Sequence, residues 1–136
     1  MKITTVLFLL CVIAVSAQHR LSVTVEGVKS SEGEINIALY NEAHGFLKFD
    51  RAFKADSTKA QQGTTAFTIE NLPEGVYAIA LFHDINSNKQ LDTNWLGIPK
   101  ERVAFSKSKM KKFGPPCFED CAFPLQNDRT LVMAFH

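Results

Sequence analysis

The chain has 136 residues, of which 46% are hydrophobic, with 15 basic and 14 acidic side chains. This length suits one domain with a substantial core. The near-neutral charge argues against a general nucleic-acid-binding protein, which would present a strongly basic surface. After residue 17 no apolar run approaches the 20 or so residues that a membrane-spanning helix needs, so we expect neither a nucleic-acid partner nor a membrane span in the mature protein.

The first 17 residues have the pattern of a secretory signal peptide. Lys2 precedes an apolar segment at residues 6–15, and small residues lead up to Ala17. An uncleaved membrane anchor is the alternative, but the apolar segment is short for one. We therefore expect cleavage after Ala17, a single mature domain at residues 18–136, and a secreted or periplasmic protein of the cell envelope.

Three segments alternate between apolar and polar side chains, as half-buried strands do: residues 21–26, 34–40 and 65–70. The first two are expected to form an antiparallel hairpin. Residues 76–82 are apolar on both faces, which predicts a central strand. We expect the third segment to form a hairpin with this central strand across the turn that contains Pro73 and Gly75.

The remaining chain adds shorter strand signals, at residues 102–106, 118–125 and 130–135, and no long amphipathic helix. The pattern F-x-I-x-N-L-P-x-G-x-Y-x-I at residues 67–79 resembles the hairpin of transthyretin-like β-sandwich domains. Many short strands separated by turns predict an all-β fold. We expect an antiparallel β-sandwich of about seven strands, transthyretin-like or immunoglobulin-like.

The polar loop after the predicted central strand carries oxygen-bearing side chains at alternate positions: Asp84, Asn86, Asn88 and Asp92. Together with the Gln90 carbonyl they predict a calcium site, because calcium prefers six to eight hard oxygen ligands. In a tightly curled loop these side chains can point inward while Ile85 and Leu91 face the core.

This loop departs from the EF-hand pattern in two places. Lys89 stands where the turn glycine is needed, and Trp95 stands where a bidentate glutamate is needed. The departures predict weak, structural calcium binding, with a dissociation constant of about 10⁻⁴–10⁻³ M. The alternative is an Asx-rich loop held by its own side-chain-to-backbone hydrogen bonds.

Only Cys117 and Cys121 remain after the expected cleavage. A pair of cysteines in an oxidising compartment predicts a disulfide. Catalysis has weaker candidates: a hydrolase-like site around His83, Asp84 and Glu119, or Cys117 as a nucleophile. The chain has no G-x-S-x-G, H-E-x-x-H or glycine-rich phosphate motif. We therefore assign no catalytic residue and interpret His83 as a strand-end histidine in a hydrogen-bond network.

Two surface features could recognise a partner. The lysines of one loop form a positive patch that could meet anionic glycans or lipid head groups: Lys107, Lys109, Lys111 and Lys112. Trp95, the one tryptophan, could stack on a sugar or peptide. The alternatives are a solvated loop for the lysines and a plug at the end of the sandwich for Trp95.

Three motifs in the second half of the chain carry a family resemblance: Y-A-x-x-x-x-H-D-x-N-x-N, then L-D-x-N-x-x-G-x-P-x-E, then F-G-P-P-x-F-E-D. With these motifs, residues 21–135 resemble the bacterial domain-of-unknown-function family 2141. The resemblance implies a small exported protein of the cell envelope with a β-sandwich fold, and it implies no activity. Cys117 and Cys121 depart from the family pattern, which suggests an added crosslink.

The sequence therefore predicts an exported β-sandwich module that binds an unknown protein or glycan of the cell envelope, or has a structural role there. The small enzyme is one alternative to this interpretation. A carrier of small ligands is the other, and a cavity lined by phenylalanine inside the sandwich would favour it.

Overall fold

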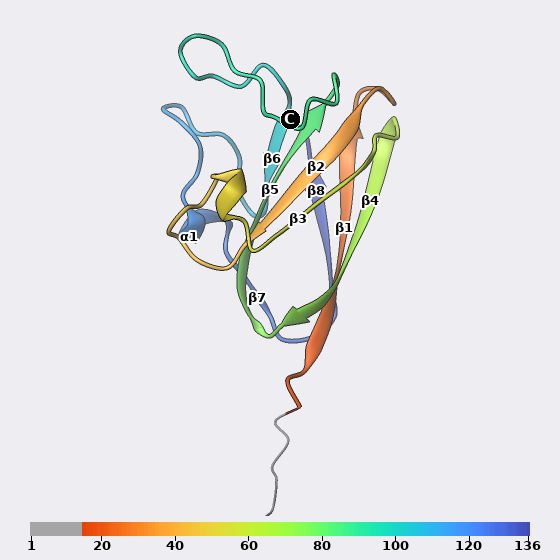
Figure 1. The fold of residues 1–136 in the computed structure, drawn as a ribbon, viewed down its shortest axis with the longest axis vertical. Coiled ribbons are helices and arrows are strands. Elements are labelled where there is room, and N and C mark those ends of the chain that lie inside the picture. Colours follow the sequence, from red (N-terminus) through yellow and green to blue (C-terminus); the bar gives the residue numbers. More distant parts are fainter. Residues whose placement is uncertain (1–14) are drawn as a thin grey trace, which may run out of the picture.

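The computed structural model describes residues 15–136 as two β-sheets packed face to face (Figure 1). The first sheet has the order β4-β1-β8 and contains β1 (Gln18–Val28), β4 (Gly63–Pro73) and β8 (Arg129–Ala134). The second has the order β3-β2-β5-β6 and contains β2 (Glu34–Tyr40), β3 (Lys54–Lys59), β5 (Gly75–Asp84) and β6 (Val103–Phe105). β7 (Phe123–Leu125) pairs with the start of β5. Most of the predicted signal peptide lies outside the described residues.

The all-β prediction is confirmed, with eight strands in the described part of the chain. Every pairing is antiparallel except that of β1 with β8. The helices within residues 15–136 are both short: η1 (Phe49–Arg51) and α1 (Phe118–Cys121). Within residues 15–136 no helix is both long enough and apolar enough to cross a membrane.

Both predicted hairpins are wrong, because the strands concerned lie in different sheets. β1 pairs with β4 and β8, whereas β2 pairs with β3 and β5. The turn between β1 and β2 passes Gly33, which has a φ of +68° and where a Cβ atom would lie 2.0 Å from the carbonyl oxygen of Asp84. Only glycine fits this approach to β5, and it lets the chain pass from the first sheet to the second.

The chain also changes sheets between β4 and β5. At this corner the Tyr77 hydroxyl donates a hydrogen bond of 2.7 Å to the carbonyl oxygen of Pro73, four residues upstream. Immunoglobulin-like sandwiches use such a tyrosine corner where the corresponding strands cross between sheets. The motif predicted as a hairpin is therefore an inter-sheet corner.

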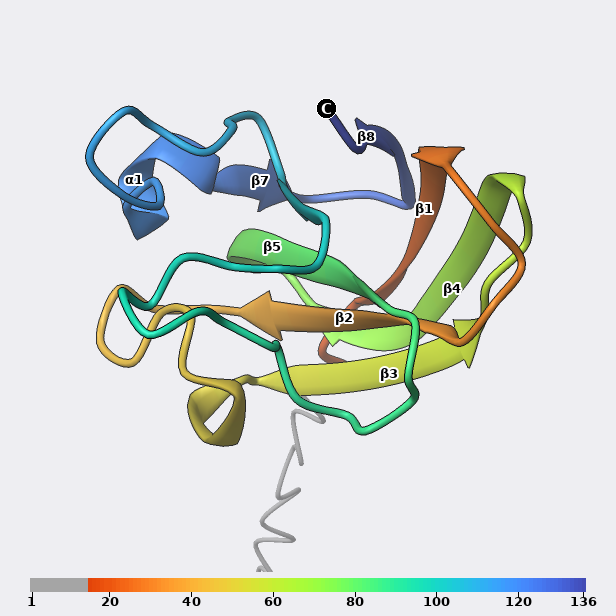
Figure 2. The same cartoon turned by 90° about the horizontal axis from the view of Figure 1, so that it is seen from above.

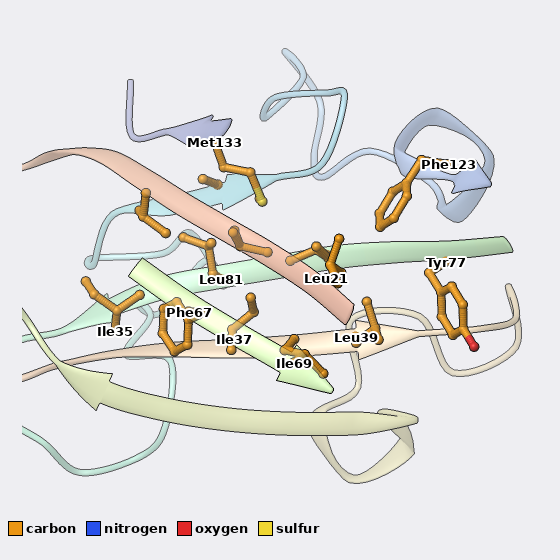
Figure 3. Close-up of a cluster of buried hydrophobic side chains, with 14 of the residues drawn as sticks. Leu21, Ile35, Ile37, Leu39, Phe67, Ile69, Tyr77, Leu81, Phe123 and Met133 are labelled. Atoms are coloured by element: carbon orange, nitrogen blue, oxygen red, sulfur yellow. The ribbon is translucent and has the colours of Figure 1, made fainter. Parts of the chain in front are cut away.

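The core fills the space between the two sheets (Figure 3). Leu21 and Val23 of β1 meet Ile37 and Leu39 of β2, and all four are at most 1% exposed. β5 lies between β2 and β6, so its predicted interior position in the sheet is confirmed. Its predicted burial on both faces fails at Val76, which is half exposed.

A second, smaller apolar cluster lies on the outer face of the second sheet. Ala78 of β5, Phe105 of β6 and Cys121 of α1 are buried there. Phe46 and Phe118 pack against this cluster, and their two rings meet edge to face. Figure 2 shows α1 and the long loops on the side of the second sheet that faces away from β1 and β4. Helix α1 and the long loops therefore cover part of the outer face of this sheet.

Candidate functional site

The site begins with a row of small side chains on the outer face of the second sheet. Successive strand residues point to opposite faces, and large buried side chains such as Ile37 of β2 and Ile79 of β5 fill the inward positions. Outward, Ala38 of β2 lies directly opposite Ala80 of β5, which in turn pairs with Phe105 of β6. Tyr40 and Phe82 stand beside the alanines. Small residues between large ones leave a depression in the sheet surface.

Three loops build walls around this depression and turn it into a groove of about 800 Å³. This is the size of a small-molecule site, and most of the lining is apolar. We call it the outer groove. Its walls come from the loop before β3, from the loop between β5 and β6, and from the loop between β6 and α1: Leu47, Phe49, Leu91, Leu96, Ile98, Pro99, Met110, Phe113 and Pro115.

Large apolar side chains stand exposed along the rim of the outer groove. The Phe113 side chain is 94% exposed to solvent and that of Leu96 is 61% exposed. Trp95, the neighbour of Leu96, is 91% exposed, so it does not plug the end of the sandwich. A group of exposed apolar residues around a concave surface is typical of an interaction site.

The rim is also basic. Residues 85–116 carry seven basic and two acidic side chains, and Lys89, Lys111 and Lys112 line the groove. Lys89 forms an ion pair of 2.9 Å with Glu34, and Lys111 forms one with Asp120. The Lys111 ammonium holds the pKa of the Asp120 carboxyl at about 2.

The loop between β5 and β6 is anchored by a buried carboxylate. Asp84 is fully buried, and its Oδ2 accepts hydrogen bonds from Asn36 Nδ2 at 3.1 Å and from the backbone N–H of Lys89 at 2.7 Å. Its Oδ1 accepts a hydrogen bond from the backbone N–H of Asn88 at 3.2 Å. Asp84 therefore acts as a fixed acceptor for the start of the loop.

Asp92 is bonded by side-chain amides of the same loop. The Nδ2 groups of Asn86 and Asn88 donate to it at 2.8 and 2.9 Å, and these two bonds lower the pKa of the Asp92 carboxyl. The amide oxygens of Asn86 and Asn88 accept backbone N–H groups of Asn88 and Gln90 instead. The predicted ligands are thus joined to one another, with amide nitrogens directed at Asp92.

This arrangement is that of the Asx-bonded loop that was the alternative to a calcium site. The prediction that Ile85 and Leu91 face the core is wrong: they are 50% and 39% exposed, and Leu91 lines the outer groove. Within residues 15–136 no group of three or more His, Cys, Asp or Glu side chains has the geometry of a metal site. Calcium binding by Asp84, Asn86, Asn88, Gln90 and Asp92 stays a prediction.

Cys117 is the N-cap of α1 and Cys121 is its last residue, and both are free thiols in this structure. The Cys117 thiol donates to Asp120 Oδ2 at 3.1 Å, and this bond raises the pKa of Cys117. Burial raises the pKa of Cys121 to about 11. Both shifts disfavour the thiolate, which is the nucleophilic form, and so they argue against Cys117 as a nucleophile. The disulfide stays a prediction.

The residues of the hydrolase-like alternative are not assembled into a site. His83 is 1% exposed, lies on the inner face of β5, and its Nε2 donates to the carbonyl oxygen of Glu32 at 2.7 Å. Asp84 follows directly and points to the opposite face. Glu119 lies exposed on α1, which packs near Ala78 at the other end of β5. His83 thus has the surroundings of a structural histidine.

Sequence reasoning missed the outer groove. The alternative of a small-ligand carrier predicts a cavity inside the sandwich, but core side chains fill that space. The available signal was in β5, which is apolar on both faces, and in the alanines at two outward positions. Which loops would cover those alanines depends on tertiary structure.

Residues 23–132 match the family model described as an uncharacterised protein conserved in bacteria, domain-of-unknown-function family 2141. The chain belongs to this family. The match confirms the resemblance seen in the sequence motifs, and it assigns no activity. Neither the curated proteins nor the solved structures contain a match to this chain.

Proposed function

We propose that this member of family 2141 is an exported binding module that holds a small amphipathic anion in the outer groove. The observation that carries the proposal is an apolar groove of about 800 Å³ with lysines along its rim. The proposed carrier differs from the one predicted from the sequence in the place of its ligand, which lies between the second sheet and its covering loops rather than inside the sandwich.

The lining defines the chemical class of the ligand. An alkyl chain or aromatic ring suits the floor of Ala38 and Ala80, flanked by Phe82 and Phe105. A carboxylate, sulfonate or phosphate on the same molecule would reach Lys89, Lys111 or Lys112 at the rim. Apolar walls with a few polar groups that fix orientation are the usual design of small-molecule sites.

Export and the finer fold type belong to the same proposal. The charged, apolar and small-residue segments of residues 1–17 support cleavage after Ala17, leaving a mature domain of residues 18–136. The Tyr77 corner supports an immunoglobulin-like sandwich. N-terminal sequencing of protein recovered from the culture medium or periplasm would test the cleavage site.

The groove is tested with 8-anilinonaphthalene-1-sulfonate, an apolar anion whose fluorescence rises in apolar surroundings. We expect saturable binding and its displacement by dodecanoate. Ala80→Phe fills the floor and should weaken binding by about tenfold or more, since a blocked pocket loses most of its contact area. Ala66→Phe is the matched control, because Ala66 is an exposed outward residue of β4 on the other sheet.

Folding and charge are checked in parallel. Near-ultraviolet circular dichroism shows that each variant keeps its tertiary packing, because this dye also binds partly unfolded proteins. The methyl ester of dodecanoate, which lacks the negative charge, should displace the dye less well than the acid. Equal dye binding by wild type and folded Ala80→Phe would overturn the proposal.

A further inference from the structure

We propose that the two loop tips beside the outer groove dock on an anionic lipid bilayer through Trp95 and Phe113. This inference goes beyond ligand binding in the groove, because it concerns the surface on which the protein works. It rests on three features of the same side of the molecule: exposed aromatic tips, rigid turns that present them, and a local excess of positive charge.

The aromatic tips are the most exposed large apolar side chains of their loops. Trp95 is 91% exposed and Phe113 is 94% exposed, and Leu96 and Ile98 beside Trp95 are also more than half exposed. Both loops line the outer groove, so their tips lie on the same side of the second sheet. Aromatic rings with this exposure suit the interface between lipid head groups and acyl chains, where tryptophan in particular is enriched.

Hydrogen-bonded turns hold both tips away from the body of the domain. Asn94 Oδ1 accepts from the backbone N–H groups of Leu96 at 2.9 Å and Ile98 at 3.0 Å, which closes the turn around Trp95. The backbone N–H of Lys111 donates to the carbonyl oxygen of Gly114 at 2.8 Å, which closes the turn around Phe113. Preformed turns lose little conformational entropy on docking.

The charge distribution fits an anionic membrane. Residues 85–116 carry seven basic and two acidic side chains, whereas the rest of the chain carries eight and twelve. Lys100, Lys109 and Lys112 form no ion pair within residues 15–136, and the ammonium of Lys112 lies 5.5 Å from the centroid of the Phe113 ring, so no carboxylate competes with lipid phosphates for these three lysines. An anionic surface would therefore attract the loops at residues 85–116 more strongly than the rest of the chain. A soluble anionic glycan could bind the lysines and stack on Trp95, but it would leave the apolar side chains of Leu96 and Ile98 beside Trp95 exposed to water.

The test uses the full mature protein with vesicles of phosphatidylcholine, prepared with and without phosphatidylglycerol. We expect co-sedimentation with the anionic vesicles only, together with a blue shift of the emission of Trp95, the one tryptophan in the chain. Lipids brominated on their acyl chains should quench that emission. Increasing salt should weaken binding, because it screens the lysines.

Matched variants separate the tips from general effects. Trp95→Ala should lower vesicle partitioning by about tenfold, and the double variant Lys109→Glu/Lys112→Glu by more than that, given the attraction of each lysine to anionic lipid. The controls are Val132→Ala, an exposed apolar residue of β8, and Lys59→Glu on β3, neither of which should change partitioning.

Failure of this inference is distinguishable from failure of the groove proposal. Trp95 does not line the outer groove, so the Trp95→Ala variant should keep its affinity for dodecanoate while its partitioning to anionic vesicles falls. Equal binding to neutral and anionic vesicles, no shift of Trp95 emission, or binding to heparin without binding to vesicles would each overturn membrane docking. None of these results would affect dodecanoate binding.

Discussion

The two faces of the second sheet are packed to different degrees, although the same strands build both. On the inner face Ile35, Ile37 and Leu39 are fully buried against the first sheet. On the outer face, Ala38 of β2 and Ala80 of β5 lie directly opposite each other and form the floor of the outer groove. The strands thus separate two tasks on alternate residues: inward side chains stabilise the fold and outward ones shape a site.

The outer face of the first sheet differs from that of the second, because no loop within residues 15–136 covers it. A β-sandwich therefore does not require covering loops on its outer faces. Its outward residues are mostly polar or small, among them Ser22, Thr24 and Thr68, and the apolar Val132 of β8 is 62% exposed rather than covered. The loops at residues 85–116 and helix α1 lie only over the second sheet (Figure 2). An apolar outer surface and long covering loops therefore occur together on one side of the molecule.

The largest expected effect comes from truncating the inner face. Ile79 of β5 is fully buried in the main core, so Ile79→Ala should lower the free energy of unfolding by about 2–5 kcal/mol. Val103 of β6 lines the outer groove and is only partly buried, so Val103→Ala should cost about 1 kcal/mol or less. Urea denaturation of both variants measures the difference. Equal losses would show that the outer face stabilises the fold as much as the core does.

The second prediction concerns α1, which covers part of the outer face. A Cys117–Cys121 disulfide in protein from an oxidising compartment should stabilise the fold by about 2 kcal/mol, since it closes a short loop. Reduction would then lower the melting temperature, and intact mass would reveal two fewer hydrogens before reduction. The double variant Cys117→Ser/Cys121→Ala is the control that reduction should not affect. Two free thiols in the exported protein would contradict the prediction.

The chain has two tyrosines, one on each face of the second sheet. Tyr77→Phe removes the bond to the Pro73 carbonyl and should cost about 1 kcal/mol of unfolding free energy. It also leaves Tyr40 as the sole phenol. Burial, and to a smaller extent Asp50, raises the pKa of Tyr40 from 10.0 to about 12.

Because the folded state holds the Tyr40 proton more tightly, the stabilisation from Tyr40 is complete below pH 10 and is lost as the pH rises toward 12. An ultraviolet titration of Tyr77→Phe should therefore show no phenolate near pH 10 while the protein is folded. Phenolate that forms at pH 10 in folded protein would mean that the outer face is more hydrated around Tyr40 than its packing against Phe46 indicates.

Alternation along the strands predicted which residues are buried but not which strands pair. Leu21, Val23 and Val25 are buried as the pattern of β1 predicts. The expected pairing of β1 with β2 failed because alternation is a property of one strand, and a short glycine-containing turn can serve either a hairpin or a change of sheet. The sequence shows a glycine at position 33, but only the packed structure shows that this glycine is required by the close approach to the Asp84 backbone.

The site was predictable in part for the same reason. The sequence indicates the loop lysines and Trp95 as candidates for partner recognition, and both lie on the side of the outer groove. The groove itself combines residues of β2, β5 and β6 with three loops that are far apart in the sequence. The volume of the groove depends on where those loops pack, and the packing of the loops cannot be predicted from a local sequence pattern.

The smallest expected effect is that of calcium on the loop that leads from β5 to the outer groove. In the structure both carboxylates are already satisfied: Asp84 by Asn36 and backbone N–H groups, and Asp92 by two side-chain amides. A calcium ion would require Asn86 and Asn88 to turn their oxygens toward Asp92 and release those bonds. Part of the binding free energy would be spent on this rearrangement.

At a concentration about five times its dissociation constant, calcium would stabilise the folded state by about 1 kcal/mol. We therefore expect millimolar calcium to raise the melting temperature by a few degrees at most. Asp92→Asn should remove this increment, while Asp56→Asn, which changes an exposed carboxylate on β3, should keep it. Asp84→Asn is a poor test, because Asp84 anchors the loop without any metal. If calcium leaves the melting temperature of the wild type unchanged, the hydrogen bonds among Asn86, Asn88 and Asp92 are what hold this loop beside the groove.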